Sequence, residues 1–257
     1  MFRKTIIITG ASSGLGAALA IKYSNVANKL FLFGRSEQRL EQIATICREN
    51  GAYVTGIIAD VTDAALMRQH LDDIASEHGI DIVIACAGVS AGTLDGPETQ
   101  AQALKIFATN INGVLNTVMP VIPHMISKRG GNIAIVSSMA GFLGLSSAPS
   151  YSASKGAVRL FSDALRGYLK KYGINVSTII PGYITTPMTE VNNFPMPFKI
   201  DAERAAHKII HGIAKNKGVI AFPLLMYFFL KLLNLLPSGF ITYINAKLPA
   251  KPAFEEI

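Results

Sequence analysis

The chain has 257 residues, a net charge of +7 and a composition that is 50% hydrophobic and 16% charged. This composition excludes intrinsic disorder and allows one large domain with a buried core. Two distant cysteines, Cys47 and Cys86, exclude a disulfide framework and indicate a reducing cytoplasm, and no Cys/His cluster predicts a metal site.

The positive charge is scattered along the chain. No basic stripe with interleaved aromatic residues is present, so the sequence predicts no nucleic-acid partner. The N-terminal apolar run resembles a signal peptide only briefly, because it ends at Thr9-Gly10 and is too short for a secretory segment. It is better interpreted as a buried strand.

Seven short apolar runs alternate with longer helical patterns. The runs are unbroken, as in strands covered on both faces, and they are Thr5–Thr9, Lys29–Phe33, Tyr53–Ala59, Ile82–Ala85, Asn132–Ser137, Asn175–Ile180 and Gly218–Phe222. Helices are predicted over about 14–26, 36–50, 62–78, 98–127, 150–172 and 201–215. Repeated strand–helix–strand units predict an α/β fold, a doubly wound parallel sheet of the Rossmann type in three αβα layers.

A glycine-rich turn follows the first strand and predicts phosphate binding. Gly10 suits a tight turn, Gly14 lets the backbone approach a pyrophosphate, and Gly16 allows close packing of helix and strand. The hydroxyls of Ser12 and Ser13 and the N-terminus of the next helix can hold phosphate oxygens. The spacing differs from the G-x-G-x-x-G of other dinucleotide folds.

The end of the second strand predicts the form of the dinucleotide. An acidic residue there would bind the ribose 2′-hydroxyl of NAD, but the segment Phe33-Gly34-Arg35-Ser36 has no carboxylate before Glu37. Arg35 can bind a 2′-phosphate with two hydrogen bonds. We therefore predict NADP(H) in preference to NAD(H); the alternative for Arg35 is a solvated residue at a helix start.

Tyr151 and Lys155 lie one helical turn apart, on the same face. A free phenol has a pKa of about 10, so a nearby ammonium that favours phenolate would bring proton exchange closer to neutrality. The same spacing recurs in the C-terminal region, at Tyr227/Lys231 and Tyr243/Lys247. The spacing alone is therefore not specific, and the surrounding residues must decide.

Taken with their neighbours, these residues resemble the short-chain dehydrogenase/reductase family. The residues that carry the resemblance, besides the glycine-rich turn, are Asp60-Val61, Ala87-Gly88, Asn110, Ser138, Tyr151, Lys155 and Pro181-Gly182. The match extends from the first strand to about Phe222. One departure is Ala85-Cys86-Ala87-Gly88, where the family often has Asn-Asn-Ala-Gly; this change concerns support of the sheet, and Cys86 is interpreted as a small buried residue.

The resemblance implies an enzyme that transfers a hydride between NADP(H) and a carbonyl or secondary alcohol carbon. It implies that Tyr151 is the general acid or base, that Lys155 tunes Tyr151 and holds the nicotinamide ribose, and that Ser138 orients the substrate oxygen. Asn110 would position a proton-relay water. Ser137 and Asn112 are the neighbouring alternatives.

The same resemblance assigns the coenzyme site. Its residues would be Gly10, Ser12, Ser13, Gly14, Leu15, Gly16, Arg35, Asp60, Val61, Ala87, Gly88, Tyr151, Lys155, Pro181, Gly182, Ile184 and Thr186. Residues 1–222 would then form a single dinucleotide-binding catalytic domain. The alternative function is a non-catalytic, dinucleotide-binding regulatory or scaffold protein.

Residues 223–257 form an apolar, amphipathic extension. Leu224–Leu236 is almost wholly apolar with a narrow polar stripe that includes Tyr227 and Lys231, and a weaker stretch, Phe240–Leu248, follows. About thirteen residues span roughly 20 Å, less than the ~30 Å of a bilayer core. The extension can complete a subunit interface, cover the substrate mouth or lie on a membrane surface through 224–248.

Substrate and partners are predicted less directly. The segment 187–198 is rich in Phe, Pro and Met and predicts an apolar, lipid-like carbonyl or alcohol substrate. The helices 98–127 and 150–172 resemble those that pair subunits in the family, which implies a homodimer or homotetramer. We expect a cytoplasmic protein with peripheral membrane association.

Overall fold

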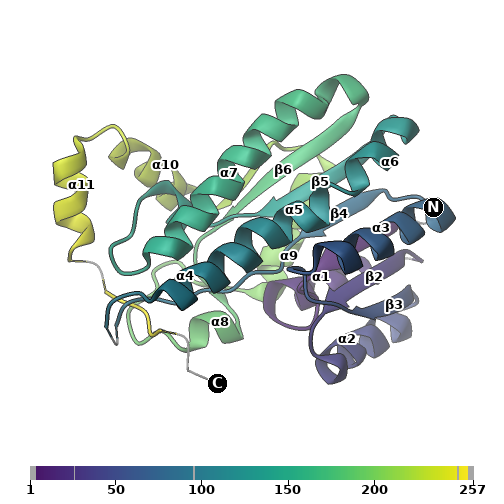
Figure 1. Ribbon diagram of the computed structural model, residues 1–257, viewed down its shortest axis with the longest axis horizontal. Helices are drawn as coiled ribbons and strands as arrows, with labels where there is room; N and C mark the ends of the chain where they lie inside the picture. The colour runs from purple at the N-terminus through teal and green to yellow at the C-terminus, as the bar shows by residue number, and fades with distance from the viewer. Residues whose placement is uncertain (1–3, 26, 95, 248, 254–257) are drawn as a thin grey trace.

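A seven-stranded parallel sheet forms the centre of the molecule (Figure 1). The structure is a computed structural model, and it describes residues 4–25, 27–94, 96–247 and 249–253. The strand order is β3-β2-β1-β4-β5-β6-β9. The strands are β1 (Thr5–Thr9), β2 (Lys29–Gly34), β3 (Tyr53–Ile58), β4 (Ile82–Ala85), β5 (Gly131–Val136), β6 (Ile174–Pro181) and β9 (Val219–Phe222). The predicted doubly wound parallel sheet is confirmed.

The strand order reverses at β1. The chain leaves β1 for β2 and β3 on one side, and then returns to place β4 against the other side of β1. In an open α/β sheet, the crevice beyond the carboxyl ends of the strands at such a reversal is where ligands bind. The fold therefore places its ligand crevice just after Thr9 and Ala85.

Helices cover both faces of the sheet. One face carries α1 (Gly14–Tyr23), α2 (Glu37–Glu49) and α9 (Ala202–Ala214). The other carries α3 (Ala64–His78), α4 (Gln100–Phe107), α5 (Gly113–Val118), α6 (Val121–Lys128) and α7 (Pro149–Leu169). This arrangement confirms the three-layer αβα architecture.

Successive residues of the central strands point to opposite faces and so build two separate cores. Ile6 and Ile8 of β1 belong to the core beneath α1 and α9, whereas Ile7 between them belongs to the core beneath α5 and α7. All three side chains are fully buried. Unbroken apolar runs are thus explained by burial on both faces.

Two sequence predictions need correction. Strand β3 was expected to be covered on both faces, but it is the edge of the sheet, and Tyr53 and Ile58 are 54% and 48% exposed. The helix predicted over 98–127 is divided into α4, a π-helical turn η1 (Ala108–Asn112), α5 and α6. The wide turn at η1 accommodates the buried Asn110, and Pro120 precedes α6, where its ring prevents a continuous helix.

Small elements lie in the connections between the main strands and helices. These are the short helical turns η2 (Met139–Phe142) and η3 (Lys170–Tyr172), the strand pair β7 (Ile184–Thr185) and β8 (Ile200–Asp201), and α8 (Pro187–Glu190). The pairing of β7 with β8 closes the loop that carries α8. Of these five ranges, only η3 lies in a segment predicted from the sequence, the helix over 150–172.

The extension folds into α10 (Leu224–Leu233) and α11 (Ser238–Asn245), at the end of the molecule far from the N-terminus (Figure 1). Tyr227, expected on a polar stripe, instead turns inward and packs against Phe142 with ring centroids 5.5 Å apart. Among the described residues, no helix is long and apolar enough to cross a membrane. The predicted ends of the extension, Leu248 and 254–257, lie outside the described residues.

Candidate active site

The glycine-rich turn between β1 and α1 is shaped by close backbone approach. Gly10 has a φ of +70°, and a Cβ there would lie 2.8 Å from Cα of Ala87 on the neighbouring loop. A Cβ on Gly16 would lie 2.2 Å from the carbonyl oxygen of Gly10, which leaves no room for a side chain. Two of the three glycines are thus required by packing, and the turn brings α1 directly onto the end of β1.

The first turn of α1 presents free backbone N–H groups to the cleft. Ser13 is at the N-cap in an extended conformation, but its side chain makes no capping hydrogen bond, and the first turn contains no acidic residue. By contrast, the side chains of Ser36, Asp63, Thr99 and Asp201 cap α2, α3, α4 and α9. Uncapped amides at a helix N-terminus are suited to bind an anion.

Strands β1 and β4 are tied together at the reversal of the sheet by Thr9. Its hydroxyl oxygen accepts hydrogen bonds from the backbone N–H groups of Cys86 at 3.1 Å and Ala87 at 3.3 Å. Gly88 follows, and a Cβ there would lie 3.3 Å from Nζ of Lys155. Burial raises the pKa of Cys86 to about 12, so its thiol stays protonated.

Two arginines lie at the end of the cleft beside β2 and β3. Arg35 follows β2, and its guanidinium lies 3.7 Å from a carboxylate oxygen of Asp60. The other Asp60 oxygen accepts hydrogen bonds from the backbone and the hydroxyl of Thr62, both at 2.9 Å. Arg39, one turn after Arg35, also lines the cleft and was not predicted from the sequence.

Lys155 is 5% exposed, and no carboxylate of the described residues forms an ion pair with it. Its Nζ donates a 3.0 Å hydrogen bond to the carbonyl of Val136 at the end of β5. The hydroxyl of Ser137 donates to the backbone carbonyl of Lys155 at 2.7 Å. Because the buried ammonium has few compensating partners, burial lowers the pKa of Lys155 to about 8.

Tyr151 lies one turn before Lys155 on α7, and Ser138 lies just after β5. Burial raises the pKa of Tyr151, and a hydrogen bond with Ser138 opposes that rise without cancelling it. The hydroxyl of Ser138 is available to this site, whereas that of Ser137 is committed to Lys155. The geometry therefore distinguishes the two neighbouring serines.

Asn110 is fully buried in the π-helical turn. Its Oδ1 accepts from the N–H of Val89 at 2.8 Å, and its Nδ2 donates to the carbonyl of Val89 at 2.9 Å and the hydroxyl of Ser154 at 3.0 Å. Asn112 is exposed. Asn110 thus connects the loop after β4 to Ser154 of α7, the residue before Lys155.

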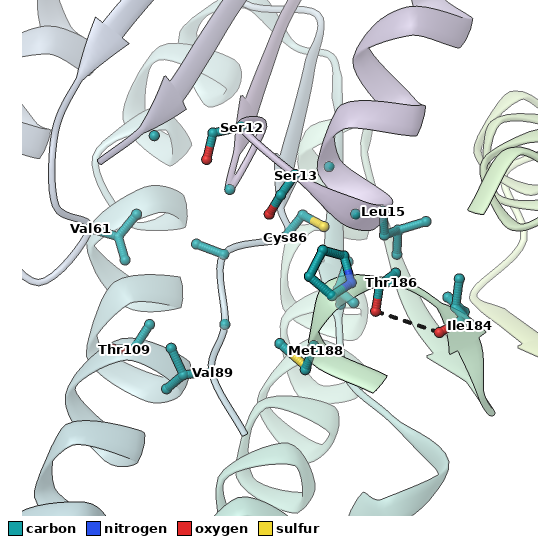
Figure 2. A pocket seen from close by; sticks show the side chains of 18 of the residues that line it. Ser12, Ser13, Leu15, Val61, Cys86, Val89, Thr109, Ile184, Thr186 and Met188 are labelled. Atoms are coloured by element: carbon teal, nitrogen blue, oxygen red, sulfur yellow. Dashed lines mark hydrogen bonds between the residues drawn. The ribbon is translucent and has the colours of Figure 1, made fainter. Parts of the chain in front are cut away.

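The opposite wall of the cleft comes from the segment after β6. Figure 2 shows Thr186 and Met188 facing the same space as Ser13, Val61 and Val89, with the Thr186 hydroxyl directed to the carbonyl of Ile184 at 3.5 Å. The N–H of Thr186 donates to the hydroxyl of Thr189 at 3.1 Å.

All seventeen residues assigned to the coenzyme line this one cleft, which has a volume of about 270 Å³, and so does Ser138. Asn110 lies behind the wall. The structure adds lining residues that were not assigned from the sequence, such as Ser36, Arg39, Val89 and Thr109, and Met188 of the predicted apolar segment 187–198 also lines the cleft. The i, i+4 spacing of Arg35 and Arg39 was the available signal for Arg39. Among the described residues, no group of three His, Cys, Asp or Glu side chains could hold a metal ion.

Comparison with known proteins shows a single family. Residues 4–195 match the family described as short chain dehydrogenase. An uncharacterized oxidoreductase of Myxococcus xanthus is 35% identical over 226 residues, covering 87% of this chain and 88% of the relative. A second, from Staphylococcus epidermidis, is 31% identical over 84% of this chain and 93% of its own length.

Solved structures share the fold. A short-chain dehydrogenase from Sphingobium yanoikuyae in complex with NADPH has a TM-score of 0.81 at 24% identity, covering 98% of this chain and 99% of that chain. A short chain dehydrogenase/reductase from Burkholderia phymatum in complex with NAD has a TM-score of 0.82 at 24% identity and covers all of both chains. One from Mycobacterium paratuberculosis bound to NAD is 25% identical over 85% of this chain and 94% of that chain, with a TM-score of 0.75.

Proposed function

The chain belongs to the short-chain dehydrogenase family of oxidoreductases, and from this we propose that it interconverts an apolar carbonyl compound and its secondary alcohol with NADP(H). One observation carries the proposal. Ser138, Tyr151 and Lys155 meet at the same cleft that contains the glycine-rich turn and the uncapped N-terminus of α1. The matched relatives are named as oxidoreductases, and none supports a non-catalytic scaffold.

The cleft residues fit a nicotinamide dinucleotide. The turn at Gly10 and Gly16 has no room for side chains, and the free amides of α1 would hold the pyrophosphate. Asp60 and Val61 would lie at the adenine, and Ile184 and Thr186 at the nicotinamide. When bound, the coenzyme supplies or accepts the hydride.

Tyr151 would exchange the proton with the substrate oxygen. Because burial raises the pKa of the phenol, the chain's own groups favour the protonated form, which is the form that donates to a developing alkoxide. We propose reduction as the direction in the cell on the basis of the proposed preference for NADPH. Ser138, hydrogen-bonded to Tyr151, would hold the same substrate oxygen and stabilise its charge.

Lys155 and Asn110 would support that proton transfer. The Lys155 ammonium lines the cleft, where it can bind the ribose hydroxyls of the coenzyme. Its positive charge, together with that of a bound oxidised nicotinamide, would lower the pKa of Tyr151. Asn110 fixes the loop at Val89 and the Tyr151–Lys155 turn through Ser154. In this role it positions a relay water and the helix together.

Replacing Tyr151 by Phe removes the acid but keeps the ring and its packing. We expect kcat/KM for a reducible carbonyl substrate to fall by about 10²–10⁴-fold, since general acid catalysis is lost. NADPH affinity, measured by fluorescence titration, should be unchanged. Tyr243→Phe, in the exposed copy of the motif, is the control and should behave as wild type. Normal turnover by Tyr151→Phe would refute the assignment.

The preference for NADP(H) rests on the two arginines. Arg35 and Arg39 line the cleft beside β2, and Arg35 is 63% exposed at its side chain and free to reorient. A 2′-phosphate can receive charge-assisted hydrogen bonds from both guanidinium groups. Asp60, 3.7 Å from Arg35, is the carboxylate that could instead favour NAD, and Arg35 partly neutralises it.

The Arg35→Ser/Arg39→Ser double variant tests this preference. NADPH should bind at least about tenfold more weakly, since each lost hydrogen bond to a charged group is worth ~1.5–3 kcal/mol. NADH affinity should stay the same, because NADH has no 2′-phosphate. Calorimetric titration with both coenzymes measures the ratio. Arg68→Ser, an exposed arginine outside the cleft, is the control. Equal losses for NADPH and NADH would contradict the proposal.

The substrate is proposed to be apolar and lipid-like. Met188 lines the cleft, and Phe194 packs edge-on to Tyr183 with centroids 6.3 Å apart, which places an aromatic pair on the loop after β6. Phe142 and Leu143 follow Ser138 in an apolar cluster. Apolar side chains on the loops beside the cleft would favour a hydrophobic ketone over a sugar.

We also propose a cytoplasmic homodimer or homotetramer that pairs through α4 and α7. Both helices expose large apolar side chains on the outer surface. Leu104 on α4 is 59% exposed, and Leu160 and Tyr168 on α7 are 61% and 57% exposed. Burial of such side chains would stabilise a subunit interface.

The extension is proposed to contact an anionic membrane surface. On α10, Tyr227 and Leu230 are buried, while the outer face exposes Leu224, Leu225, Phe228, Phe229 and Leu232 by 57% to 70%. Exposed apolar patches of this kind mark interaction sites. Residues 223–253 contain no Asp or Glu, and Lys231 and Lys247 are exposed. This charge complements anionic lipid, whereas a symmetric dimer through α10 would bring Lys231 towards its own copy.

Vesicle flotation tests the membrane contact. The wild-type protein should float with vesicles of anionic phospholipid and less with neutral ones, and the Phe228→Ser/Phe229→Ser variant should lose most of this binding because it removes buried apolar area. Ile46→Ser, an exposed apolar residue on α2, is the control. No flotation of the wild type would refute the proposal. Loss of an oligomer in the double variant, with flotation unchanged, would assign the face to a subunit interface.

A further inference from the structure

We infer that residues 245–247 and 249–253, here called the strap, position the three loops that frame the substrate side of the cleft. This inference rests on the proposed carbonyl chemistry at Tyr151 and adds the strap as a positioning element for it. Figure 1 shows the yellow chain beyond α11 running back beside the blue loop that precedes α4, near α8. The strap therefore returns from the end of the molecule to the loop that precedes α4.

The three loops leave the carboxyl ends of neighbouring strands. The first follows β4 and contains Val89, the second follows β5 and contains Ser138, and the third follows β6 and contains Met188. Each of these residues lines the cleft. A substrate held between Tyr151 and the nicotinamide site would contact walls that come from all three loops.

The strap pairs with the first loop through its backbone. The N–H of Gly92 donates to the carbonyl of Pro252 at 2.8 Å, and the N–H of Leu94 donates to the carbonyl of Lys251 at 3.0 Å. A Cβ on Gly92 would lie only 2.3 Å from the carbonyl oxygen of Lys251. Gly92 does not have a positive φ, so its lack of a side chain is required by the approach of the strap and of the Ser147 carbonyl oxygen, 2.8 Å from the same Cβ, rather than by the turn.

The second loop is held where α11 ends. Asn245 is 4% exposed, and its Nδ2 donates to the carbonyl of Gly144 at 3.0 Å. The hydroxyl of Ser146 donates in return to the backbone carbonyl of Asn245 at 2.8 Å. Both partners lie between Ser138 and Tyr151 in the sequence. The strap thus fixes the chain segment that connects the two proposed catalytic residues.

The third loop is held by a side chain. Nζ of Lys251 donates a 2.8 Å hydrogen bond to the carbonyl of Met188. Lys251 therefore bridges two loops, since its backbone binds Leu94 and its ammonium binds α8. Lys251 is half-buried, and burial lowers the pKa of its ammonium to about 8.

This arrangement predicts that the coenzyme site and the substrate walls are positioned by different parts of the chain. The phosphate cradle is on β1 and α1, and the strap contacts named above all go to the loops after β4, β5 and β6. Displacing the strap should move the substrate walls without altering the cradle. Misplacement of a substrate by about 1 Å can slow a reaction by about 10²-fold.

Two variants test the strap. Gly92→Ala forces a Cβ against the Lys251 carbonyl, and Lys251→Met removes the hydrogen bond to Met188 but keeps an apolar side chain. In each, the KM for the carbonyl substrate should rise by about tenfold and kcat should fall less, because substrate positioning is lost. NADPH affinity should stay within about twofold of wild type. Hydrogen–deuterium exchange of residues 187–190 should become faster in both.

The controls are Gly239→Ala, where a Cβ on α11 meets nothing within 4 Å, and Lys208→Met on the exposed face of α9. Wild-type KM in both strap variants would overturn the inference. An equal loss of NADPH affinity and substrate affinity would also overturn it, by showing a general structural role. If the wild type reduces no carbonyl, the proposed function fails, and the exchange measurement alone then decides whether the strap holds α8.

Discussion

The site depends on the attachment of Lys155 in α7 to the end of β5. Two hydrogen bonds connect them, from the Lys155 ammonium to the carbonyl of Val136 and from the hydroxyl of Ser137 to the carbonyl of Lys155. Gly141 approaches the same point, where a Cβ would lie 2.6 Å from the carbonyl carbon of Lys155. This attachment fixes the rotation of α7, and so it also fixes the Tyr151 phenol one turn earlier.

Burying an ammonium without a neighbouring carboxylate is unfavourable, and the consequence is a change in pKa at this site. The lowered pKa of Lys155 and the raised pKa of Tyr151 have the same first cause, the removal of water from the cleft wall. Shifted groups of this kind, gathered beside a cleft, are typical of sites that move protons. Asn110 contributes by joining this turn of α7 to the loop at Val89, so the residues proposed to handle the proton and the sheet reversal form one connected unit.

Much of this could be predicted from the sequence, because parallel strands buried on both faces leave unbroken apolar runs. Runs such as Thr5–Thr9 and Ile82–Ala85 coincide with β1 and β4. The edge position of β3 could not be predicted, since an apolar run does not state how many neighbours it has. The strap was equally hidden: the contact between Gly92 and Lys251 joins residues far apart in the sequence, and neither carries a motif. The position of Arg39 could not be predicted without the start of α2, because only a helix that begins there places Arg39 one turn after Arg35.

The extension has three distinct sides. Its inner side packs Tyr227 against Phe142 beside the Ser138 loop, its outer side is apolar and basic, and its end returns to the substrate walls. An apolar substrate that reaches the protein from a lipid surface would meet these parts one after another. The proposed substrate class and the proposed membrane contact therefore support each other on structural grounds.

The most direct measurement is an ultraviolet titration of the Tyr151 phenol, taken as the difference between wild type and Tyr151→Phe, with and without NADP+. The account predicts that the pKa, raised by burial, falls when the positively charged nicotinamide binds beside Lys155, and that Lys155→Met weakens this fall. A Tyr151 pKa that does not change on NADP+ binding would contradict the proposal that the phenol and the coenzyme share one site.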